Sequence, residues 1–132
     1  MKGGRVIRVI RDFSLTPPRV EWKERDVTAA IIRYLRVRGW RCQRQHSGLA
    51  RFPGGGAPVR IGEPGIADWL CLRPLCEGVA EVFYLELKAP GGKLSQAQQD
   101  WLRRRTVERF EAIAAHSLEW FDLWYRRRFP GG

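Results

Sequence analysis

The chain of 132 residues is long enough for a single hydrophobic core, and its hydrophobic content of 44% with six tryptophans excludes an intrinsically disordered protein. No apolar run approaches the roughly 20 residues of a transmembrane helix, and arginines interrupt the apolar N-terminal stretch, so we expect neither a membrane span nor a signal peptide. The net charge of +10 favours a polyanionic partner such as nucleic acid, although a basic surface without such a partner explains the charge equally well.

The cysteine content bears on the compartment and on zinc binding. Cys42, Cys71 and Cys76 are odd in number and form no close CxxC pair. We therefore expect reduced thiols in a cytoplasmic protein. A zinc site that also uses His46 is the less favoured alternative.

Residues 1–20 are expected to form an irregular basic arm ahead of a single domain that spans residues 21–132. In the arm, Arg5, Arg8 and Arg11 recur among Val and Ile. This pattern suits either an edge strand or a segment that grips phosphate or a second subunit.

The segment from residue 21 to residue 38 has the apolar periodicity of an amphipathic helix, which Gly39 ends as a C-cap. Glu24 lies three residues before Val27, so we expect its carboxylate to point along the buried stripe. The helix dipole alone favours a glutamate in the first turn. The inward direction nevertheless indicates a role in a functional site.

Residues 40–47 alternate enough for a strand, and residues 48–64 are rich in Gly and Pro without periodicity. We expect a long loop over the second segment, and a loop of this length in a compact domain more often has a function than serves as a mere connection. A solvated insertion is the alternative. Basic side chains that we expect to contact a nucleic-acid backbone are Arg41, Arg44, His46, Arg51 and Arg60, with Lys93 from a later turn.

Two short apolar strands are expected over residues 65–72 and 82–87, joined by a hairpin-length link over residues 73–78. The second strand is apolar enough to be central and covered on both faces. Glu86 and Lys88 lie on one face at its end. Because a buried charge without a partner costs several kcal/mol, roughly, these residues form either a plain ion pair or part of a metal site.

Asp68 opens the first of these strands. An aspartate at a strand end is often only a turn former. Two adjacent strands can also bring Asp68 and Glu86 within reach of one ion. Such hard oxygen ligands suit Mg²⁺ or Mn²⁺.

The rest of the chain predicts a helix, a short strand and a final helix. Ser95 and Gln98 form a capping box at the start of the first helix, which runs to about Arg105 and turns Gln98 inward. The strand is expected over residues 110–115 and the final helix over residues 117–129.

The final helix is apolar over more than the stripe that packing within one chain requires. Trp120 and Trp124 recur four residues apart beside a face formed by Leu118, Phe121 and Tyr125. Excess aromatic surface often marks an interface, so we expect a homodimer with this helix or the arm in its interface. The alternative is that the arm covers these rings within one chain.

The order Asp68, Glu86, Lys88 resembles the Asp…Glu-x-Lys arrangement of the PD-(D/E)xK nuclease superfamily. The strings GIADW and YLELKAPGGKLSQAQQDW are more specific and resemble the VRR-NUC (virus-type replication-repair nuclease) family. The resemblance covers about Glu24 to Trp101. Residues 103–109 are rich in arginine where that family often has a glycine turn.

The resemblance implies an α/β, restriction-endonuclease-like core in which helices flank a mixed β-sheet. It implies that Asp68 and Glu86, with the Leu87 carbonyl, bind Mg²⁺ or Mn²⁺. Lys88 would orient or activate the attacking water, and Glu24 and Gln98 would complete the site. The expected activity is hydrolysis of DNA phosphodiester bonds, selective for branched DNA such as Holliday junctions or flaps, by a dimeric protein of a bacterial or phage-infected cell. The alternative function is a non-catalytic basic nucleic-acid-binding module in which the Glu86–Lys88 pair is structural.

Overall fold

The computed structural model describes residues 21–46, 48–51 and 53–132, so the predicted basic arm, residues 1–20, lies outside the described residues. Among the described residues, no helix is long and apolar enough to cross a membrane. Each of the three cysteines is a free thiol, as predicted.

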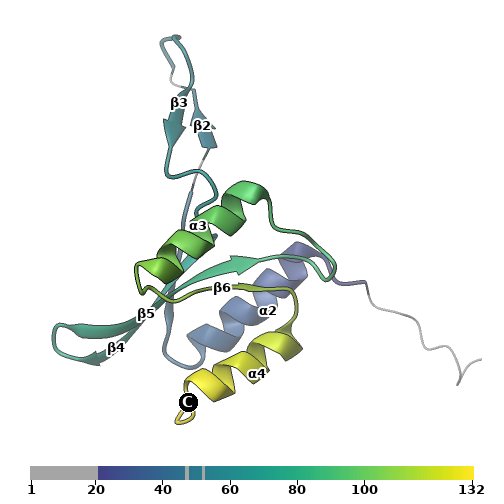
Figure 1. Ribbon diagram of the computed structural model, residues 1–132, viewed down its shortest axis with the longest axis vertical. Helices are drawn as coiled ribbons and strands as arrows, with labels where there is room; N and C mark the ends of the chain where they lie inside the picture. The colour runs from purple at the N-terminus through teal and green to yellow at the C-terminus, as the bar shows by residue number, and fades with distance from the viewer. Residues whose placement is uncertain (1–20, 47, 52) are drawn as a thin grey trace, which may run out of the picture.

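A four-stranded mixed sheet with three helices around it forms the body of the molecule (Figure 1). The strand order is β1-β4-β5-β6, in which the first three strands are antiparallel and β6 runs parallel to β5. This confirms the predicted α/β class with a mixed sheet flanked by helices. The strands are β1 (Arg41–Arg44), β4 (Trp69–Cys76), β5 (Val79–Leu87) and β6 (Ala112–Ala115). The helices are α2 (Glu24–Arg36), α3 (Gln96–Val107) and α4 (Leu118–Arg128).

Strand β5 lies inside the sheet and is covered on both faces, as its apolar sequence predicts. Phe83, Leu85 and Leu87 are fully buried in the core that α2 and α4 help to form. On the opposite face, the ring of Tyr84 meets the ring of Trp101 from α3 with 4.9 Å between their centroids. Alternation along the strand therefore directs Glu86 toward α3.

The amphipathic helix α2 has the predicted apolar stripe. Val27, Ile31 and Leu35 are fully buried, and each such side chain contributes about 2 kcal/mol to folding by leaving water. Gly39 follows the helix with a φ of +88°, a left-handed conformation that glycine adopts without strain. Helix α4 buries Phe121 and Tyr125 in the same core.

The predicted strand ends need correction. The first of the two apolar strands begins at Trp69 instead of Gly65, residues 73–76 of the expected link belong to β4, and the second strand begins at Val79. Only Glu77 and Gly78 form the turn. The sequence did not indicate a strand here because the segment contains a charged residue and a proline. In the structure, Arg73 of β4 forms an ion pair with Glu81 of β5 at 2.8 Å, and Pro74 lies at a β-bulge.

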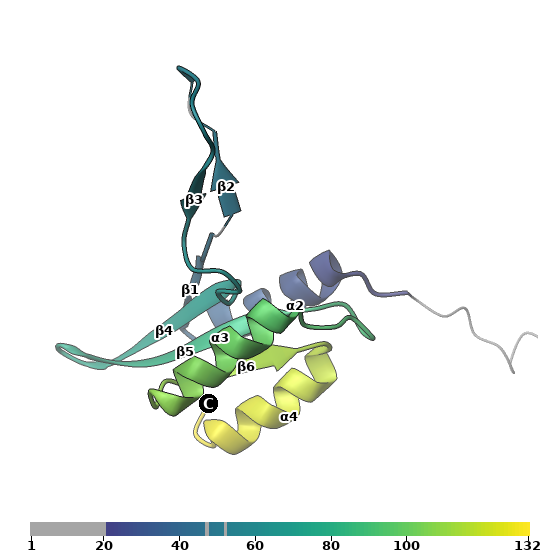
Figure 2. The same cartoon turned by 45° about the horizontal axis from the view of Figure 1, so that its top comes forward.

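The predicted unstructured loop over residues 48–64 is also wrong, because it contains a β-hairpin. Strands β2 (Gly48–Ala50) and β3 (Val59–Ile61) pair antiparallel, contact no other described helix or strand, and project from the body (Figures 1 and 2). Leu49, Val59 and Ile61 are exposed. Short strands that bury no face leave no alternation in the sequence.

A turn after α3 replaces the glycine turn expected from the resemblance. Arg109 has a φ of +69°, the one left-handed non-glycine residue in the described chain. The arginine-rich segment therefore makes the same reversal before β6 that a glycine makes more easily.

Candidate active site

Asp68 and Glu86 lie side by side where β4 begins and β5 ends. Trp69 pairs with Leu85, so the next position along the antiparallel ladder places Asp68 opposite Glu86. The Asp68 N–H donates to Glu86 Oε2 at 3.0 Å, and the Leu87 N–H donates to Asp68 Oδ2 at 3.1 Å. The two carboxylates predicted to share a site are therefore in contact through the backbone of both strands.

The Glu86 carboxylate is buried inside this contact, with only 1% of the residue exposed. Its Oε1 accepts from Gln98 Nε2 at 2.8 Å and lies 3.5 Å from Lys88 Nζ. Burial and the neighbouring Asp68 carboxylate raise the pKa of Glu86 to about 7, against the opposing effect of Lys88. Two carboxylates therefore lie together at this point, with the Lys88 ammonium beside them.

Gln98 has both of the roles that its sequence position suggests. Its Oε1 accepts from the Ser95 N–H at 2.8 Å, and the Gln98 N–H donates to Ser95 Oγ, so the predicted capping box is present. The same side-chain amide donates to Glu86. The cap of α3 therefore fixes the orientation of the amide that holds Glu86.

The loop before Asp68 is attached to α3 by residues that sequence analysis did not select for a role. Gly65 has a φ of +75°, and a Cβ at this position would collide with the Ala97 carbonyl. Glu63 accepts from Trp101 Nε1 at 2.9 Å. These contacts between distant segments position Asp68, and only the G-x-x-D string in the family resemblance signalled the first of them.

Helix α2 faces Asp68 across an open cleft of about 340 Å³. The cleft is lined by Glu24, Arg25, Thr28, Ala29, Arg44 and Asp68. The prediction that Glu24 points along the buried stripe is wrong, because Glu24 is exposed and burial along α2 begins only at Val27. Its carboxylate nevertheless belongs to the cleft. Thr28, four residues later on the same helix face, was missed although this spacing could have revealed it.

The basic residues predicted to contact nucleic acid do not all line this cleft. Arg44 lines the cleft, whereas Arg41 lies at the opposite end of β1, next to Leu72. Arg51 is exposed directly after β2, and Arg60 is in β3. His46, before the hairpin, and Lys93, before α3, are both exposed. Their contacts with nucleic acid remain a prediction.

The donor set fits a hard divalent cation with few protein ligands. Among the described residues, no group of three or more His, Cys, Asp or Glu is placed to hold a metal ion. Mg²⁺ keeps several waters and is commonly bound by one or two carboxylates together with substrate phosphate oxygens. Asp68 and Glu86 provide two such carboxylates, and the Leu87 carbonyl is a further oxygen at the same strand end.

Comparison with known proteins finds no match: no protein-family model, no curated protein and no solved structure matches the chain. The resemblance to the VRR-NUC family therefore remains an expectation from short sequence strings. The functional argument depends on the geometry of Asp68, Glu86, Lys88 and Gln98.

Proposed function

We propose that this protein is a Mg²⁺- or Mn²⁺-dependent DNA endonuclease. The observation that supports this most directly is the gathering of Asp68, Glu86, Lys88 and Gln98 at the ends of two adjacent sheet strands. A buried carboxylate with a raised pKa beside a second carboxylate and a lysine is typical of a functional site. Of these four residues, Asp68 lines the open cleft on the side of α2.

In this proposal each residue of the site has a distinct role. Asp68 and Glu86 would hold the divalent ion, which when bound polarises a phosphate and lowers the pKa of a coordinated water. Lys88, beside Glu86, would orient the attacking water and counter the charge that develops on the phosphate. Gln98 would hold Glu86 in position, and Glu24 would act from the α2 side of the cleft.

The net charge of +10 suits binding to the phosphate backbone of DNA. Arg25 and Arg44 line the cleft, and Arg51 follows β2 toward the tip of the hairpin. Selectivity for branched DNA and a homodimeric assembly complete the proposal, because symmetrical cutting of a four-way junction requires two sites related by a two-fold axis.

A second candidate is a basic nucleic-acid-binding module without catalysis. It is favoured by the hydrogen bonds of Glu86, since both of its carboxylate oxygens have partners within the chain without any metal. In that case the Glu86–Lys88 pair stabilises the fold only. Divalent-metal binding separates the candidates, because a pure binding module needs none.

The test is incubation of the protein with linear, flapped and four-way DNA, with Mg²⁺, with Mn²⁺ and with EDTA. We expect cleavage of branched substrates with either metal and none in EDTA. Isothermal titration of the protein with Mn²⁺ provides the metal affinity independently. Tight, salt-sensitive DNA binding without cleavage and without heat of metal binding would establish the binding module instead.

A further inference from the structure

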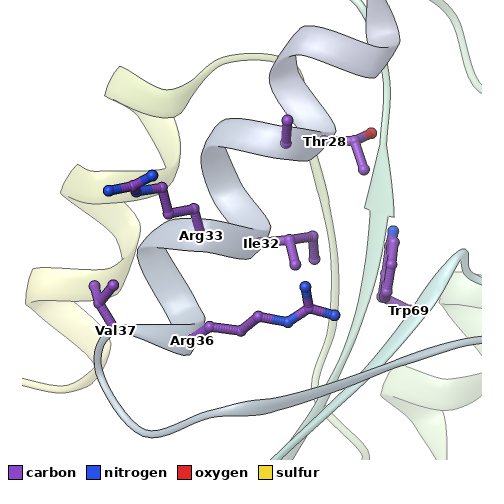
Figure 3. Close-up of a pocket in the computed structure, with 7 residues that line it drawn as sticks. Thr28, Ile32, Arg33, Arg36, Val37 and Trp69 are labelled. Carbon is purple, nitrogen blue, oxygen red and sulfur yellow. The ribbon is translucent and has the colours of Figure 1, made fainter.

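A second depression, larger than the cleft, lies between α2 and the start of β4 (Figure 3). Its volume is about 640 Å³. In the figure, Trp69 of β4 stands opposite Ile32, and the Arg36 side chain reaches from the end of α2 toward the same space. The lining residues are Thr28, Ala29, Ile32, Arg33, Arg36, Val37 and Trp69, which we call the Trp69 groove.

The chemistry of the Trp69 groove suits a flat, uncharged ring that is attached to an anion. The half-buried indole of Trp69 and the aliphatic side chain of Ile32 provide apolar walls. Arg36 provides positive charge, whereas the Arg33 side chain points away from Trp69 in Figure 3, and no carboxylate is among the described residues that line the groove. A nucleobase with its phosphate has this combination of a stacking face and a negative charge.

The Trp69 groove is continuous with the cleft at Asp68. Thr28 and Ala29 line both depressions, and Trp69 directly follows Asp68 in the chain. Arg44 joins them as well, since it lines the cleft and its guanidinium carbon lies 5.5 Å from the centroid of the Trp69 ring. A DNA strand with one phosphate at Asp68 would therefore pass a neighbouring nucleotide along this groove.

We propose that the Trp69 groove binds an unstacked nucleobase of the DNA strand whose phosphate lies in the cleft. The ligand is taken from the proposed function, so this inference rests on nucleic acid being the substrate. Stacking of one base on an aromatic side chain raises affinity by roughly 10-fold. The groove thus links cleavage to distorted or branched DNA, where bases are already unstacked.

The experiment compares two duplexes that carry the same single-nucleotide bulge, one with a base and one abasic at the bulged position. Binding is measured in EDTA, so that no strand is cut. The variants are Trp69→Leu, which removes the stacking face, and Ala29→Phe, which fills the groove from an exposed position. Phe110→Leu is the matched control, because Phe110 is an exposed aromatic residue after α3 and does not line the groove.

We expect the wild-type protein and Phe110→Leu to prefer the base-containing bulge by roughly 10-fold, and Trp69→Leu and Ala29→Phe to lose this preference. Should Trp69→Leu fail to fold, Ala29→Phe decides the question, because it removes no core contact. A wild-type protein without the preference, or variants that keep it, would overturn the inference. A groove variant that keeps the preference but no longer sediments as a dimer would assign the groove to a second copy of the chain.

These outcomes differ from those that test the proposed function. Cleavage of branched DNA without any preference for the bulged base would leave the nuclease proposal intact and reject the groove as a base site. A preference for the base in a protein that never cleaves DNA would support the groove and reject the nuclease.

Discussion

The Asp68 side chain separates a metal-binding role from a structural one. Asp68→Asn keeps an oxygen that can accept from the Leu87 N–H but removes the charge. We expect cleavage to fall by about 100-fold or more, because the metal loses an anionic ligand. DNA binding should survive or tighten, since one negative charge leaves the cleft. Near wild-type cleavage by a folded Asp68→Asn protein would contradict the assignment.

Lys88 gives a second test at the scale of single residues. Its ammonium lies 3.5 Å from Glu86 Oε1, as a neighbour of the proposed metal and not as a ligand. We expect Lys88→Ala to lose about 100-fold or more in turnover while Mn²⁺ affinity and Tm stay close to wild type. A structural ion pair predicts the reverse, a lowered Tm, because Glu86 would lose the cationic partner that it has among the described residues. Comparing thermal melts with single-turnover rates distinguishes the two.

The raised pKa of Glu86 predicts how the metal-free protein responds to pH. Burial and the Asp68 carboxylate raise the pKa of its carboxyl from 4.5 to about 7 in the folded chain. The folded state therefore holds the proton more tightly, so this contribution to stability is complete below about pH 4.5 and is lost as the pH rises through about 7. The loss amounts to about 3 kcal/mol.

Urea unfolding in EDTA from about pH 5 to about pH 8, compared between the wild-type protein and Glu86→Gln, measures this effect. The variant cannot ionise at this position. The unfolding free energy of the wild-type protein should therefore fall relative to that of the variant as the pH rises. Parallel pH profiles would show that Glu86 is ionised in the folded protein throughout this range.

At the scale of helices and strands, periodicity carried most of the prediction. Helix α2 was predictable because buried residues such as Val27 and Leu35 repeat with the helical period. Strand β5 was predictable because it is a short, apolar run that contains the buried Phe83. The meeting of Asp68 with Glu86 followed from two adjacent strands, of which the first begins beside Asp68 and the second ends beside Glu86.

Features that depend on contacts between distant segments were not predictable in this way. The exposure of Glu24 arises because the first turn of α2 extends beyond the core, which the phase of the helix does not reveal. The close approach of Gly65 to Ala97 leaves no local pattern either. The hairpin was missed because Leu49 and Val59 are exposed, so its strands show no buried face.

The β2–β3 hairpin supplies a prediction for a whole element. Residues 48–61 include Arg51 and Arg60 and no acidic residue, and the two strands contact no other described helix or strand. Replacing residues 48–61 by a short glycine linker should leave Tm nearly unchanged. DNA affinity should fall, and the slope of log affinity against log salt should become shallower by roughly two, one for each arginine removed from a phosphate.

Fluorescence anisotropy over a salt series measures this slope. Arg127→Gln, an exposed arginine on α4, is the control for removal of positive charge elsewhere. An unchanged slope in the shortened protein would show that the hairpin does not contact the DNA backbone.

At the scale of the whole molecule, the surface of α4 bears on the predicted homodimer. Packing within the chain uses part of the aromatic surface, since the Trp124 ring lies 5.2 Å from the Phe83 ring, centroid to centroid. Trp120 and Leu123 remain 45% and 59% exposed on the same helix. Paired large apolar side chains on an exposed helix face are typical of an interface core.

We therefore expect the protein to sediment as a dimer at micromolar concentration in moderate salt. The Leu123→Glu variant should be a monomer, because a dimer would bury the new charge beside the same charge of the second copy. Glu119→Lys is a suitable control, since it changes charge at a neighbouring exposed position of α4 without adding to or removing from the apolar surface. If two sites must act together, the Leu123→Glu monomer should nick one strand of a four-way junction and lose paired incision, while its rate on a flap stays near wild type. A wild-type species near 15.3 kDa would contradict the dimer and, with it, paired incision by two copies of this chain.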